Sequence, residues 1–163
     1  MAEENGAAGT SETRKSGQQF AIQKIYLKDS SFETPNSPEI FRGEWKPKVS
    51  VDLSSETRKL GEKSYETILK VTVTARVEEK VAYLCEVHQA GIFALEGFKP
   101  DALDVLLGSY CPANLFPYAR EVVSDLVSKG GFPQMLLGPV NFDALYMQRK
   151  QKEKESAEAS ADN

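Results

Sequence analysis

The chain has 163 residues, enough for one domain, and its 40% hydrophobic and 27% charged residues are typical of a soluble globular protein. A formal net charge of -4 argues against a duplex nucleic-acid binder, which needs a basic face. No apolar run approaches the roughly 20 residues that span a bilayer, and the N-terminus lacks the basic and apolar regions of a signal peptide. We therefore expect a cytoplasmic protein without nucleic-acid binding or membrane insertion.

The N-terminal residues 1–18 are rich in Gly, Ala, Ser and Glu without periodicity, which predicts a disordered extension. Residues 20–28 then have strand composition, but the apolar positions change parity after Ile22. A β-bulge, or partial cover on both faces, explains this change. Such a strand could also be an edge onto which a second subunit adds.

Residues 29–43 contain two prolines and several turn formers, which predicts a long loop. This loop also carries Phe32, Ile40 and Phe41, which a purely disordered linker would not need. Residues 44–53 alternate strictly between apolar and polar side chains, which predicts a half-buried strand.

A β-hairpin is predicted over residues 64–90. Residues 64–77 alternate, Glu78 and Glu79 break the pattern, and the alternation resumes at Val81. Together with the earlier strands, this hairpin forms an antiparallel sheet with one apolar face.

The most amphipathic stretch is 114–133, which predicts a helix with Pro117 in its first turn and an end at Gly130 and Gly131. Its apolar stripe is the natural cover for the apolar face of the sheet.

Two shorter helices are predicted on either side of this long one. Residues 101–109 form the first, capped by Asp101, and Asn141 or Asp143 caps the second. The mixed-charge residues 148–163 are expected to fray as a flexible tail.

The residues that metal, nucleotide or nucleophilic chemistry requires are sparse. His88 is the single histidine, and in a strand it faces away from Cys85, which argues against a shared metal site. Cys85 and Cys111 are expected to be reduced, buried thiols. Gly130 and Gly131 follow a helix instead of opening one, so no phosphate-binding loop is predicted. We expect no metal and no cofactor.

Acidic side chains gather in a way that leaves two interpretations open. Asp29 and Glu33 flank the predicted loop, and Glu86 follows Leu84 on one strand face. They are either solvated surface charges or an acidic docking patch for a basic partner.

Apolar side chains around the loop leave a similar choice. Phe32, Ile40, Phe41 and Trp45 either fold the loop back onto the domain or line an exposed groove for extended peptide.

Three runs of sequence, residues 22–41, 84–93 and 106–146, closely resemble the SecB family of bacterial protein-export chaperones. The resemblance implies an α+β fold in which a four-stranded antiparallel sheet carries helices on one face, assembled as a homotetramer that is a dimer of dimers. It also implies a SecB-like chaperone domain over residues 19–147. The extension 1–18 is longer than the family leads us to expect, and the tail carries a basic cluster.

The resemblance further implies a non-enzymatic function. SecB-like proteins bind unfolded precursor proteins without ATP, keep them export-competent and deliver them to the motor ATPase SecA. The positions that match the family's SecA-docking surface are Asp29, Glu33, Leu84 and Glu86. The matching client groove comprises Phe32, Ile40, Phe41, Trp45, Tyr146 and Met147.

Two other functions remain open from the residues alone. A hydrolase of the thioesterase-like type could use Glu86 or Asp29 as its base, which would require a sealed apolar pocket. A carrier for a small apolar ligand is the second alternative.

Overall fold

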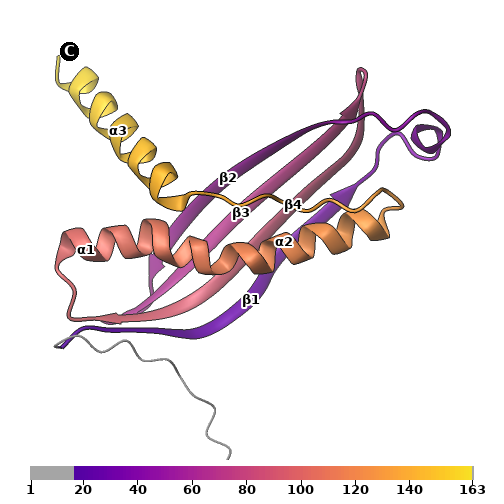
Figure 1. The fold of residues 1–163 in the computed structure, drawn as a ribbon. Coiled ribbons are helices and arrows are strands. Elements are labelled where there is room, and N and C mark those ends of the chain that lie inside the picture. The colour runs from indigo at the N-terminus through magenta and orange to yellow at the C-terminus, as the bar shows by residue number, and fades with distance from the viewer. Residues whose placement is uncertain (1–16, 163) are drawn as a thin grey trace, which may run out of the picture.

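The computed structural model describes residues 17–162, so the disorder expected over residues 1–18 lies outside the described part except at Gly17 and Gln18, which lead directly into the first strand. One four-stranded antiparallel sheet has the strand order β1-β4-β3-β2. Its strands are β1 (Gln19–Glu33), β2 (Lys48–Lys59), β3 (Ser64–Val77) and β4 (Lys80–Glu96). Helices cover one face of this sheet and the other face is open (Figure 1), which confirms the predicted fold class.

The hairpin between β3 and β4 forms as predicted. Glu78 adopts a left-handed conformation with φ of 56°, and Val77 pairs with Lys80 across the turn. The parity change in β1 is a bulge, because its register with β4 shifts between Ile22 and Lys24. A second shift lies between Leu27 and Asp29, so the side-chain alternation of this edge strand changes parity twice.

The predicted loop over residues 29–43 begins too early. β1 continues to Glu33, since pairing with β4 satisfies its backbone groups and outweighs the turn preference of the serines there. β2 begins at Lys48, later than predicted, and runs on through polar residues to Lys59. The connection between the two strands contains a 3-10 helix, Glu39–Arg42.

The helical segment also begins earlier than predicted. α1 (Pro100–Val105), the π-helical segment η2 (Leu106–Tyr110) and α2 (Cys111–Lys129) follow one another without a break. Pro117 therefore lies inside α2 and not in a first turn. It is tolerated because it lies on the exposed side, where water can bind the carbonyl that its missing N–H leaves free.

The core lies between α2 and the central strands β3 and β4. Buried side chains on α2 include Leu115, Ala119 and Val123, which alternate with exposed ones at helical spacing. β2 lies beyond this cover. Val51 pairs with Val73 and points to the same face, yet Val73 is fully buried while Val51 is 41% exposed.

After α2, residues 130–141 run back across the same face to α3 (Phe142–Ala161), which projects from the sheet (Figure 1). Asn141 caps α3 by accepting a hydrogen bond from the Ala144 amide at 3.0 Å. The charged segment that we expected to fray continues this helix to Ala161, with side-chain pairs such as Lys150 with Glu153 along it.

Candidate functional site

Four predicted docking residues meet on the open face of the sheet, and we call them the acidic patch: Asp29, Glu33, Leu84 and Glu86. The register of β1 on β4 sets Glu33 opposite Leu84 and Asp29 opposite His88. Leu84 and Glu86 point away from the helices, because Cys85 between them is buried in the core. Both carboxylates of β1 are exposed, so the patch is available to a partner.

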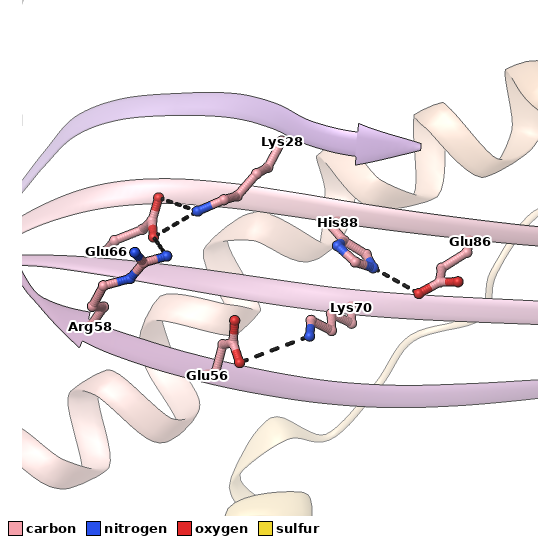
Figure 2. A network of polar contacts seen from close by, with 7 residues as sticks. All are labelled: Lys28, Glu56, Arg58, Glu66, Lys70, Glu86 and His88. Atoms are coloured by element: carbon pink, nitrogen blue, oxygen red, sulfur yellow. Dashed lines mark hydrogen bonds and ion pairs between the residues drawn. The ribbon is translucent and has the colours of Figure 1, made fainter. Parts of the chain in front are cut away.

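His88 belongs to this surface, although sequence reasoning assigned it no role there. Its Nε2 lies 2.8 Å from Oε1 of Glu86 (Figure 2). Lys70 of β3 is its register partner on the other side. The two-residue spacing from Glu86 was the available signal, because it places both side chains on one face of a strand.

Chemistry at this surface is limited by what surrounds it. Cys85 lies on the opposite face from His88, as predicted, and within residues 17–162 no three potential ligands lie close enough to hold a metal ion. The Glu86 side chain is 46% exposed and therefore is not enclosed in an apolar pocket.

Four of the predicted groove residues lie on the helix side, at the end of the sheet where β1 ends. Phe32, Phe41 and Trp45 join Tyr83 and Phe132 in what we call the aromatic cluster. The ring centroids of Phe41 and Trp45 lie 4.9 and 5.3 Å from that of Phe132. Ile40 packs beside them against the core. Phe41 is 48% exposed, so the cluster is both anchored and accessible.

The sequence analysis does not predict a groove role for Tyr83, which it places in the hairpin, or for Phe132, which directly follows the predicted helix end at Gly130 and Gly131. The signal for Phe132 was its position after Gly131, whose φ of 88° turns the chain back at the end of α2.

Tyr146 and Met147 are not part of the aromatic cluster. Tyr146 lines a separate cavity of about 280 Å³ with Leu53, Leu69 and Phe142, beneath the start of α3. Its hydroxyl donates to Asp104 at 2.6 Å. Met147 is 65% exposed beside it. The six predicted groove residues therefore form two groups.

An apolar row on β2 leads from one group to the other, and we call it the β2 row: Val49, Val51 and Leu53. These side chains share the helix-side face of the strand. Val49 and Val51 are each 41% exposed, and Leu53 reaches the cavity of Tyr146. Since Trp45 lies three residues before β2, the row begins next to the aromatic cluster.

Comparison with known proteins decides the family. The family model described as preprotein translocase subunit SecB matches residues 13–153. The chain belongs to the SecB family of protein-export chaperones. The "Protein-export protein SecB" of Alkalilimnicola ehrlichii is 61% identical over 145 residues, covering 89% of this chain and 77% of that protein. The one of Halorhodospira halophila is 53% identical over 157 residues, covering 96% and 90%.

A solved structure supports the SecB fold independently of close sequence similarity. The SecB-like chaperone of Mycobacterium tuberculosis, in complex with a ChAD peptide from an antitoxin, superposes with a TM-score of 0.61 at 13% identity. The match covers 74% of this chain and 90% of that one. Within the described part of this SecB family member, no helix is long and apolar enough to cross a membrane.

Proposed function

We propose that this SecB family protein acts in the cytoplasm as an ATP-independent chaperone that binds unfolded precursor proteins and delivers them to the motor ATPase SecA. The observation that carries this proposal is the separation of two surfaces by the sheet. The aromatic cluster and the β2 row lie on the helix side, and the acidic patch lies on the open face. One protein can therefore hold a client and a motor at the same time.

The client surface is apolar, partly exposed and elongated, which suits an extended chain better than a folded partner. Phe41, Val49 and Val51 each expose between 41% and 48% of their surface. Such side chains gain by burying apolar area against almost any unfolded segment, so nucleotide-driven selectivity is not needed.

The docking surface is polar and acidic, which suits a basic segment of the motor. Asp29, Glu33 and Glu86 supply charge, and Leu84, opposite Glu33 in the last pair of the β1–β4 register, supplies an apolar contact. Screening by salt should weaken this contact more than it weakens client capture.

A tetramer built as a dimer of dimers is part of the proposal. β1 is an edge of the sheet, and it exposes Ile22 and Leu27, at 44% and 46%, beside unpaired backbone groups. Tyr118 of α2 is also half exposed. Four chains of 18.0 kDa would give a particle of about 72 kDa by light scattering, whereas a monomer at micromolar concentration contradicts the assembly.

A refolding assay tests client binding. A slow-folding precursor is diluted from denaturant with a stoichiometric amount of protein and no nucleotide, and its refolding should be delayed. Val51→Lys should shorten the delay, because it places a charge in the β2 row. Asp52→Lys is the matched control, since Asp52 is exposed on the opposite face of the same strand. Undelayed refolding with the wild-type protein contradicts the proposal.

A binding assay with purified SecA tests docking. Asp29→Lys or Glu86→Lys should abolish SecA binding and leave client capture intact, and Glu158→Lys, at an exposed position near the end of α3, should preserve both. If Asp29→Lys loses both activities, the patch is structural instead.

The hydrolase and carrier alternatives have less support. Asp29 is exposed, and Glu86 bonds to His88 on an open surface and not in the sealed apolar pocket that such a base requires. The cavity beside Tyr146 could hold a small ligand, but it is continuous with the β2 row through Leu53.

A further inference from the structure

Glu66 is a nearly buried carboxylate on the open face of the sheet, and the docking surface described above makes no use of it. Its side chain is 9% exposed. Lys28 of β1 donates from Nζ to both carboxylate oxygens at 3.0 Å. Arg58 of β2 lies 3.1 Å from Oε1 (Figure 2). The hydroxyl of Tyr26 donates to Oε2. The single carboxylate of Glu66 is therefore in contact with two cationic side chains and one phenol hydroxyl.

The register of the strands makes this convergence possible. Arg58 is the register partner of Glu66 on β2, whereas Tyr26 and Lys28 must reach from β1 across β4. Tyr26 pairs with Ala90, a small residue whose side chain leaves room for the crossing. Burial and the bond to Glu66 raise the pKa of Tyr26 to about 12, and that bond, followed by the contact with Lys28, lowers the pKa of Glu66. These contacts therefore favour the charged form of Glu66.

One of the two cations, Lys28, lies next to the acidic patch, whereas Arg58 lies on the far edge strand β2. Lys28 directly precedes Asp29, so their Cα atoms are about 3.8 Å apart. A lysine released from Glu66 could pair with Asp29 and cancel one charge of the patch. Lys28 and Arg58 lie on the same open face as Glu86 and His88 (Figure 2).

We propose that Glu66 is a positioning residue of the docking surface, which binds Lys28 and so keeps this cation from neutralising the acidic patch, while Arg58 binds Glu66 from the other side. The inference rests on the proposed function, because it needs a basic partner on that patch. It adds a residue outside the patch that determines the strength of docking without touching the partner.

Glu66→Gln tests this directly, with purified SecA as the basic probe. The substitution keeps the shape of the side chain and removes its charge. The dissociation constant should rise about threefold to tenfold at low salt and return toward the wild-type value as salt is added, because the effect is electrostatic. Tyr26→Phe is the matched control, since it removes one hydrogen bond to Glu66 without changing any charge, and it should leave docking unchanged.

A second substitution separates positioning from a merely structural role. Adding Lys28→Met to Glu66→Gln removes the released cation, so SecA docking should recover. If Glu66 only stabilises the sheet, the double variant should bind no better than Glu66→Gln, and its loss should persist at high salt. Either result overturns the inference.

Failure of the proposed function gives a different pattern. In that case the wild-type protein does not bind SecA, or Asp29→Lys binds it as the wild type does. If Asp29→Lys abolishes docking while Glu66→Gln has no effect, the docking surface stands and the role of Glu66 is wrong.

Discussion

Gly130, the residue that ends α2, lies against the ring of Phe32 in β1, so closely that a methyl group added at Gly130 would overlap the ring. The φ of Gly130 is -69°, which any residue can adopt. The need for glycine here therefore comes from the close approach of the helix end to the aromatic cluster and not from the backbone.

Gly130→Ala should push the Phe32 ring out of its stack with Tyr83, whose centroid lies 5.7 Å away. We expect the free energy of unfolding to fall by about 1 to 3 kcal/mol, as overpacking of a core usually costs, and client capture to weaken. Urea unfolding and the refolding assay measure the two effects. Gly138→Ala is the control, because no heavy atom lies within 4 Å of its added Cβ. Equal unfolding midpoints for the two variants would contradict the packing role.

The elements that the sequence predicted well are those in which local pattern and long-range packing agree. Ser64–Val77 alternates, apart from the buried Ile68 on the open face, because both of its edges pair with other strands and one of its faces meets α2. The parity change in β1 was also readable as a bulge. In both places, the period of the apolar side chains follows directly from which face is buried.

Errors arose where pairing or position overrides local preference. The sequence predicts that Pro117 starts a helix, but its place on the exposed side allows the helix to run through it. The alternation of Val49 and Val51 was read as half-buried, but burial depends on how far α2 reaches across the sheet. Residue spacing does not predict how many strands a helix covers. The sequence therefore does not predict that the β2 row is an exposed surface.

The contacts of Glu66 cannot be predicted from the sequence, because its partners are distant in the chain. Tyr26 and Lys28 are 40 and 38 residues from Glu66 in the chain. They meet it only because β4 lies between β1 and β3 in the sheet order. A site assembled from three strands has no local signature.

The two thiols should be unreactive in the folded protein. Burial raises the pKa of Cys85 to about 11 and that of Cys111 to about 12. At pH 8 the thiolate fraction of each is then about one in a thousand or less, and the thiolate is the nucleophile. We expect no alkylation by iodoacetamide in the native state and two modifications per chain in urea, measured by mass spectrometry. Ser31→Cys, at an exposed position of β1, is the positive control. Fast native labelling of either wild-type cysteine would contradict the buried assignment.

Asp104 should anchor α3 to α1. It accepts from the Tyr146 hydroxyl at 2.6 Å and from Lys150 Nζ at 2.8 Å, and these contacts, that of Lys150 first, lower its pKa. Asp104→Asn should increase the rate at which trypsin cleaves α3, while the free energy of unfolding changes by less than about 1 kcal/mol, since exposed pairs contribute little. Asp101→Asn, at an exposed position of the same helix, should leave cleavage unchanged. Equal cleavage of both variants would mean that α3 is held by other contacts.

Glu66 should make stability depend on pH in the acidic range. Its folded pKa is lowered from 4.5, first by the bond from Tyr26, so the stability it contributes is present above the unfolded value and is lost as pH falls through the folded one. Between about pH 5 and pH 3 the urea midpoint of the wild-type protein should therefore fall more steeply than that of Glu66→Gln. Glu56→Gln is the control, because Glu56 is exposed and lies 3.8 Å from Lys70 in a looser pair. Parallel slopes for the wild type and Glu66→Gln would show that the carboxylate is not held as an anion by its three neighbours.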